Sequence, residues 1–358
     1  MMTTHRGGKE REIWVDTIRG LTILMVIFHH SLQASSQITD IPGRLFWLDW
    51  IGDHFWMPAF LFCSGLFYRS KLSKPWAVTL ESRVLFCAWL ILVWSLLSWT
   101  AEALGLDLYP WGLTSDASTM RQGLGIFFPP YGILWFVWAI LIMSVFARLI
   151  VALALPLQVL ATLALMVALS YWHDSPATTG SFEFLLYNLL HHAVPYFMLG
   201  VWLSRPVLTY FARPSRAVLP LIAGLGLTGL ILALSGPNFP LKSYLLAFAL
   251  TLGYISATRL IAEIPFVGHG LAIVGALSLQ VYLIHEFFVA LIFAGVASTG
   301  LSLSPLVTLI IIAGLASVVT IALSLINAKF GPRWLFATPR WITRQLFRPK
   351  FQTTSKPT

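Results

Sequence analysis

The chain consists of long apolar runs separated by short polar or basic segments. A membrane-spanning helix needs about 20 mostly apolar residues, and ten runs approach or reach that length. They cover residues 13–33, 53–68, 83–101, 132–150, 154–172, 187–204, 217–235, 243–259, 273–297 and 305–328. Proline and glycine mark several ends, such as Gly331-Pro332 after the last run. The pattern predicts an all-α polytopic membrane protein with about ten transmembrane helices.

The basic residues predict which way these helices face. With a cytoplasmic N-terminus, only three of the 23 Lys and Arg residues lie outside, namely Arg44, Arg121 and Lys242, and Arg19 lies within the first run. Basic residues accumulate in cytoplasmic segments of membrane proteins. We therefore expect both termini to be cytoplasmic, and an odd number of helices would break this sorting.

The predicted organisation has three parts. Residues 1–12 form a cytoplasmic N-terminal segment, 13–328 the membrane domain, and 329–358 a basic cytoplasmic tail that lies along anionic headgroups. As an alternative, the first run could be a secretory signal peptide. We disfavour that interpretation because His29 and His30 interrupt the run and because nine remaining helices would disturb the charge sorting.

Composition supports the membrane assignment and excludes other classes. The chain of 358 residues is 58% apolar and only 10% charged, whereas soluble domains are about 25% charged. The 15 Trp, 10 Tyr and 25 Phe residues suit aromatic belts at the two bilayer interfaces. We interpret the net charge of +9 as orientation charge, so the expected partner is the lipid bilayer and not nucleic acid. Cys63 and Cys87 lie in separate apolar runs and are expected to be inert packing residues rather than metal ligands.

The first run carries ionisable residues, which are costly within a bilayer and therefore suggest function. Arg19 and His30 are separated by three helical turns plus about 20°, so the two side chains share one helix face. Their Cα atoms are roughly 16 Å apart. His29 lies about 80° off that face, and Asp16 is placed to pair with Arg19. Two interpretations stay open here: a functional stripe, or an interfacial ion pair with a histidine bonded to a neighbouring helix.

The ninth run holds a second line of polar residues. Ser278 and His285 lie within about 20° of one face, and Tyr282 lies about 60° from His285. For Tyr282 we favour a structural Tyr–His hydrogen bond between helices, while the role of His285 stays open. Glu286 is placed at the outward rim.

For two further groups of ionisable residues we favour a structural role over a functional one. His191-His192 lie near the outer end of the sixth run, where exposure to the headgroup layer costs little. Arg69, Lys71, Lys74 and Arg83 are mainly orientation charges, although together they could attract a polyanion. Arg83 is the member expected to point into a cavity.

The motif Asp16-x-x-Arg19-Gly20 followed by His30 resembles the acyltransferase-3 family of integral-membrane acyltransferases. Arg83 stands where that family has a basic residue. The other matching segments, in chain order, are Phe60-Leu61-Phe62-Cys63-Ser64-Gly65, Leu134-Trp135-Phe136, Phe197-Met198-Leu199-Gly200 and Ser278-Leu279-Gln280-Val281-Tyr282-Leu283-Ile284-His285. The likeness covers roughly residues 13–328 and is greatest to fucose-acetylase-like and glucan-modifying members. His29 departs from the family pattern, which leaves the choice between His29 and His30 open, although the helical geometry favours His30.

The resemblance implies transfer of an acyl group, expected to be acetyl, from cytoplasmic acyl-CoA to a hydroxyl of an extracytoplasmic glycan or glycolipid. It implies that Arg19 and Arg83 hold the CoA phosphates, with Asp16 orienting Arg19. His30 would be the general base or the acyl acceptor, and His285 could share that role. Ser278, Tyr282 and Trp135 would support the site, and no metal is expected. Final transfer would occur within the membrane domain or with a separate extracytoplasmic partner, in the bacterial inner membrane.

Two other functions are weighed against this one. A transporter or flippase of a lipid-linked sugar is the main alternative, but such proteins often have duplicated halves, and the sequence has no convincing repeat. A non-catalytic scaffold would have no use for the stripe of Asp16, Arg19 and His30.

Overall fold

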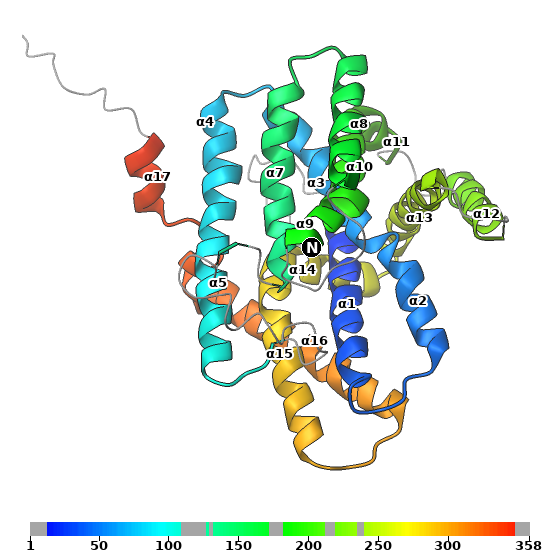
Figure 1. Cartoon of the computed structure of the whole chain (residues 1–358), viewed down its shortest axis with the longest axis vertical. Coiled ribbons are helices and arrows are strands. Elements are labelled where there is room, and N and C mark those ends of the chain that lie inside the picture. Colours follow the sequence, from blue (N-terminus) through cyan, green and yellow to red (C-terminus); the bar gives the residue numbers. More distant parts are fainter. Residues whose placement is uncertain are drawn as a thin grey trace, which may run out of the picture.

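The structure is a computed structural model that describes residues 13–108, 127–128, 132–171, 182–211, 219–234 and 240–347. Within these ranges every regular element is a helix (Figure 1). The proposed N-terminal segment 1–12, Arg121 and residues 348–358 of the basic tail lie outside the described residues. The chain is thus an all-helical polytopic membrane protein in the part that is described.

Each predicted run falls on a helix or on consecutive helical segments. These are α1 (Ile13–Ser35), α3 (Trp56–Leu72), α4 (Trp76–Thr79) with η1 (Leu80–Leu85) and α5 (Phe86–Ala103), η3 (Gly132–Leu134) with α7 (Trp135–Ile150), α8 (Leu155–Tyr171), α9 (Phe182–Asn188) with η4 (Leu189–Ala193) and α10 (Val194–Trp202), α12 (Leu219–Leu234), α13 (Pro240–Ile261), α14 (Val267–Ala276) with α15 (Ser278–Ser298), and α16 (Pro305–Phe330). Four further short elements are α2 (Gly43–Asp53), α11 (Ser204–Phe211), η6 (Arg333–Leu335) and α17 (Arg340–Phe347).

Seven helical stretches among the described residues are long and apolar enough to cross a membrane, judged by length and composition. The helices α3, α8 and α12 are shorter, with 17, 17 and 16 residues, at the lower limit of a bilayer span. The number ten and the cytoplasmic position of both termini therefore stay predictions.

Two helices differ from the predicted runs in ways that affect the site. The third run begins at Trp76 rather than at 83, so Arg83 lies inside a continuous helix, within the π-helical segment η1. Such π-turns are frequent at functional sites because they redirect side chains. The ninth run is interrupted at Leu277, which separates α14 from α15.

The outer surfaces of several helices are apolar, as expected of surfaces that face lipid. The exposed side chains include Leu160, Leu163 and Val167 on α8 and Ile310 and Val318 on α16. An apolar surface of this extent would aggregate in water. The bilayer is therefore the environment in which this fold is stable.

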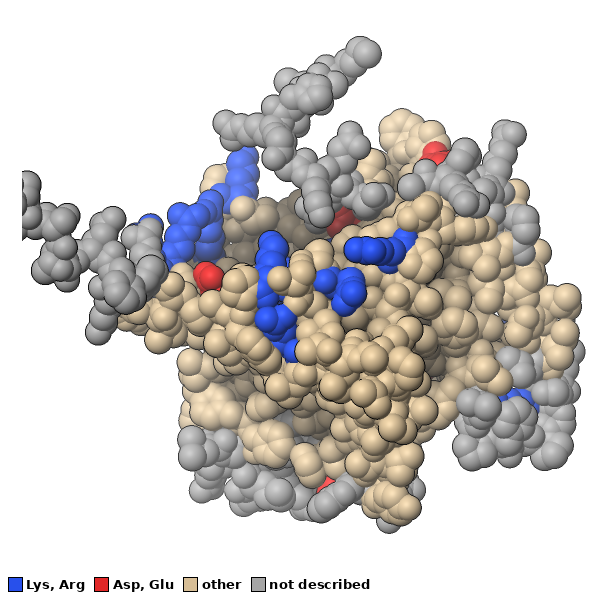
Figure 2. All heavy atoms as spheres, turned by 90° about the horizontal axis from the view of Figure 1, so that it is seen from above, with Lys and Arg blue, Asp and Glu red and all other residues tan. Residues whose placement is uncertain are grey.

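Basic side chains gather at one end of the helical assembly. The turn between α7 and α8 lies at one end and the loop between α15 and α16 at the other (Figure 1). Viewed from the α7–α8 end, basic side chains lie near the middle of the face and at one edge, with separate acidic side chains between and around them (Figure 2). Arg69 and Lys71 end α3, and Arg148 lies in the last turn of α7. The distribution agrees with the predicted sorting of charge.

Glycines allow α3 and α10 to approach each other closely. A Cβ atom on Gly65 would lie 2.0 Å from the carbonyl oxygen of Phe197, and one on Gly200 would lie 2.2 Å from that of Phe62. Small residues at such crossings permit the close backbone packing on which helix association in membranes depends. The glycines of two matching motifs therefore face each other.

Glycines also allow close backbone packing between α1 and α14. A Cβ on Gly20 would lie 1.9 Å from the carbonyl oxygen of Leu271, and one on Gly275 would lie 1.7 Å from that of Asp16. Thr17 adds a hydrogen bond from its hydroxyl to the carbonyl of Gly268, 3.4 Å long. Consequently the segment that carries Asp16 and Arg19 is tied to the helix that leads into α15.

We expect Gly65→Ala and Gly200→Ala each to lower the thermal stability of the detergent-solubilised protein, because the added methyl group collides with backbone that cannot rotate away. Overpacking of this kind costs about 1–3 kcal/mol. Gly295→Ala is the control, since nothing lies within 4 Å of a Cβ at that position on α15. Equal melting temperatures for all three variants would contradict this view of the α3–α10 contact.

The predicted orientation can be tested by labelling introduced cysteines with a membrane-impermeant maleimide. Both native cysteines are buried and free, so background labelling should be low. Gln37→Cys, beyond α1, should react in intact cells, whereas Ser73→Cys, beyond α3, should react only after the membrane is opened. Both positions are exposed in the structure. The reverse pattern would place the N-terminus outside.

Candidate active site: a cavity lined by histidines and carboxylates

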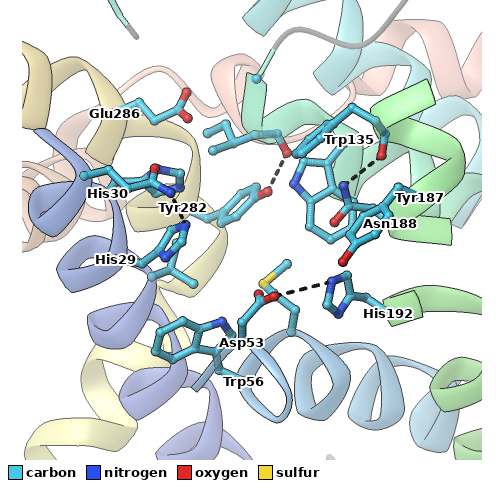
Figure 3. A pocket seen from close by; sticks show the side chains of 16 residues that line it. His29, His30, Asp53, Trp56, Trp135, Tyr187, Asn188, His192, Tyr282 and Glu286 are labelled. Carbon is cyan, nitrogen blue, oxygen red and sulfur yellow. Dashed lines mark hydrogen bonds and ion pairs between the residues drawn. The ribbon is translucent and has the colours of Figure 1, made fainter. Parts of the chain in front are cut away.

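A cavity of about 180 Å³ lies among α1, α3, α7, α9, η4 and α15. His29 and His30 lie on one side of it, Trp135, Tyr187, Asn188 and His192 on the other, and Asp53 and Trp56 below (Figure 3). Gln33, Tyr282 and Glu286 complete the polar lining. Histidine, carboxylate, amide and phenol groups thus meet in one cavity between apolar walls, which is the usual composition of a small-molecule site.

His30 and His285 meet at this cavity although they lie far apart in the sequence. Their ring centroids are 5.2 Å apart, with 44° between the ring planes. His30 lines the cavity, and His285 is fully buried beside it. The first and ninth predicted runs therefore contribute to the same site.

The hydrogen bond of His285 determines which of its nitrogens can accept a proton. Its Nδ1 lies 2.6 Å from the main-chain oxygen of Tyr282. A carbonyl oxygen only accepts, so Nδ1 is the donor and the neutral ring has its lone pair on Nε2. That Nε2 atom is buried and has no hydrogen-bond partner among the described residues. A buried acceptor held in this way is suited to general-base chemistry.

His29 is held by partners on both nitrogens. Its Nδ1 lies 2.9 Å from each carboxylate oxygen of Asp49, and its Nε2 lies 3.1 Å from the amide nitrogen of Gln33. The His29 ring also packs edge-on against Trp56, with centroids 5.9 Å apart. These contacts leave His29 as a positioning group beside His30, whose ring centroid is 5.0 Å away.

Tyr282 and Glu286 have positions that differ from the sequence prediction. The Tyr282 hydroxyl donates to the main-chain oxygen of Ile133 at 2.5 Å, so it braces the start of α7 and does not bond His285 through its side chain. Glu286 is 2% exposed and lines the cavity. It lies inside the protein and not at the outward rim, because the face of α15 that carries His285 turns toward α1.

His192 is also buried, contrary to the expectation of a headgroup position. Only 8% of its surface is exposed, and its Nε2 lies 3.8 Å from a carboxylate oxygen of Asp53. Trp135 packs near it, with ring centroids 6.3 Å apart. The π-helical segment η4 and the end of α2 together bring this pair to the cavity wall.

Arg19, Asp16 and Arg83 form a second group toward the other end of α1. Arg19 Nη1 lies 3.7 Å from Asp16 Oδ1, and Arg19 and Arg83 lie within electrostatic range of each other. The Arg83 guanidinium lies over the ring of Tyr68, 5.1 Å from its centroid. Its Nε is buried without a hydrogen-bond partner among the described residues, which is costly unless an acceptor binds there.

The predicted site residues therefore separate into two places. His30, Tyr282 and Trp135 line the cavity, and His285 adjoins it. Arg19 and its neighbours do not line it, and Ser278 starts α15 away from the lining. The α-helical rise separates the Cα atoms of Arg19 and His30 by about 16 Å.

Sequence reasoning missed Asp49, Gln33 and Asp53 as members of the site. The sequence pattern gave neither Asp49 nor Asp53 a functional role. Their sequence signal is a pair of carboxylates within the aromatic segment 46–56, where isolated acids require a partner. Their partners, His29 and His192, are decided by how α2 folds back against the bundle. No local sequence pattern specifies this packing.

The described residues thus form a helical membrane protein with paired histidines at a cavity and a cationic group nearer the other end of α1. The sequence model of the acyltransferase-3 family, described as "Acyltransferase domain", matches residues 12–327. The chain belongs to this family.

One curated protein is similar over part of the chain. It is named "Inner membrane protein YcfT", from Escherichia coli (strain K12), and is 25% identical over 222 residues. The match covers 56% of this chain and 58% of that protein. No solved structure matches this chain.

Proposed function

We propose that this protein is an O-acyltransferase of the bacterial inner membrane. It moves an acyl group, expected to be acetyl, from cytoplasmic acyl-CoA to a hydroxyl of an extracytoplasmic glycan or glycolipid. The observation that carries this proposal is the buried Nε2 of His285, held as a proton acceptor beside His30 at a polar cavity. The name of the inner membrane relative supports the location.

The histidine pair suits the proton movements of acyl transfer. The acceptor oxygen attacks the thioester carbonyl carbon, its proton passes to an imidazole, and the carbon–sulfur bond breaks. The imidazole then returns the proton to the departing CoA thiolate, so that an ester and free CoA result. In the covalent variant the imidazole nitrogen takes the acyl group first and passes it to the hydroxyl afterwards. His30 lines the cavity in either case, and His285 is placed to support it.

The cationic group nearer the opposite end of α1 suits the donor. Acyl-CoA carries phosphates at one end of a long thin arm and the thioester at the other. Arginine binds phosphate with two parallel hydrogen bonds, and the buried Nε of Arg83 still lacks an acceptor among the described residues. A span of about 16 Å along α1 matches the reach of the pantetheine arm from Arg19 to His30.

The histidine assignment predicts unequal effects of neighbouring substitutions. His30→Ala should lower acyl transfer in purified membranes by about 10²–10⁴-fold, the range expected for loss of a general base. His29→Ala should have a smaller effect, because both nitrogens of His29 already bind Asp49 and Gln33. His269→Ala is the control, since His269 is exposed on α14. Full activity of His30→Ala, with normal expression, would remove His30 from the mechanism.

The donor assignment predicts changes in KM rather than in kcat. Arg83→Ala and Arg19→Ala should each raise the KM for acyl-CoA by about tenfold or more, because each removes a charge-assisted contact worth roughly 1.5–3 kcal/mol. Arg44→Ala, at an exposed position on α2, is the matched control. Unchanged KM values in both variants would place the donor elsewhere.

A further inference from the structure

A second, smaller chamber adjoins the cavity that holds the histidine pair. The two share three lining residues, Asp53, Tyr187 and His192. Beyond them the second chamber is lined by Tyr244 and His191, among others, with Ser243 at an exposed position. The shared residues make the two chambers neighbouring parts of one polar groove.

The second chamber has aromatic walls with polar edges. The rings of His191 and Tyr244 are stacked, with centroids 5.7 Å apart and 9° between their planes. Tyr187 lies against His191, with centroids 4.5 Å apart. Asp53, at the shared boundary, faces His192 at 3.8 Å. Hydroxyl, imidazole and carboxylate groups here can pair with ligand hydroxyls, which both donate and accept, while ring faces pack against C–H surfaces.

The lining of both chambers contains no Lys or Arg among the described residues. Phosphate and carboxylate ligands are normally bound by such cations. Asp53 and Glu286 would in addition repel an anion. The groove therefore suits an uncharged, hydroxyl-rich ligand and disfavours an acidic one.

We propose that the second chamber is an acceptor subsite, so that the acceptor is a neutral glycan of at least two sugar units. This inference rests on the proposed acyl transfer. The unit that receives the acyl group occupies the cavity beside His30. The adjoining unit occupies the second chamber against Tyr244 and His191, and Asp53 lies between the two.

The test uses the purified full-length protein with acetyl-CoA and paired acceptors. The acceptors are the methyl glycosides of glucose, galactose and N-acetylglucosamine, together with methyl disaccharides built from the same units. Mass spectrometry measures the acetylated product, and kcat/KM is obtained for each acceptor. We expect at least one disaccharide to exceed its monosaccharide by about tenfold or more, the gain of one or two hydrogen bonds.

Variants locate that gain in the second chamber. Tyr244→Ala should lower kcat/KM for the preferred disaccharide at least about tenfold more than for the monosaccharide, mainly through KM, and Tyr244→Phe should retain most of the stacking. Tyr171→Ala, at an exposed position on α8, is the control that should change neither. The monosaccharide reaction also reports whether each variant is folded.

The outcomes separate the two proposals. Equal kcat/KM for mono- and disaccharides, or equal losses for both in Tyr244→Ala, would overturn the subsite and leave acyl transfer standing. Preference for an acidic or phosphorylated sugar, added as a comparison, would likewise overturn it. Absence of transfer to every acceptor would overturn both.

Discussion

The close contact between the backbones of α1 and α14 is the constraint from which the site follows. Gly20 and Gly275 each lie where a Cβ atom would collide with the partner helix. Because apolar side chains gain little from meeting each other in lipid, such backbone packing contributes much of the association energy of membrane helices. α14 leads directly into α15, so the contact also sets where α15 crosses α1. His285 is thereby placed opposite His30.

The site shows how a bilayer protein can hold ionisable groups at low cost. His29 is paired with Asp49, His192 with Asp53, and Arg19 with Asp16. An isolated charge in hydrocarbon would cost several kcal/mol. Pairing lowers this cost because neither group then exposes an unpaired charge to lipid. Two of the buried atoms that have no hydrogen-bond partner among the described residues are Nε2 of His285 and Nε of Arg83. They occur at the two places where the proposed reaction needs a proton acceptor and an anion site.

The positions of the helices could be read from the sequence because the cost of burying polar backbone in lipid acts locally. Only a helix satisfies its own backbone hydrogen bonds over an apolar run of this length, so each of the ten runs falls on a helix. The break at Leu277 and the π-turn around Arg83 could not be read in this way. Both depend on how neighbouring helices pack, and neither changes the apolar composition of its run.

Taken alone, the sequence determined the class of protein, the places of its helices and the shared face of Arg19 and His30, because hydrophobicity and helical periodicity are properties of one segment at a time. Tertiary structure decided the partners. Asp49 holds His29, His285 adjoins His30, and Glu286 and His192 turn inward. These contacts join residues up to 255 positions apart in the sequence, and they arise from the crossing of helices rather than from any local pattern of residues.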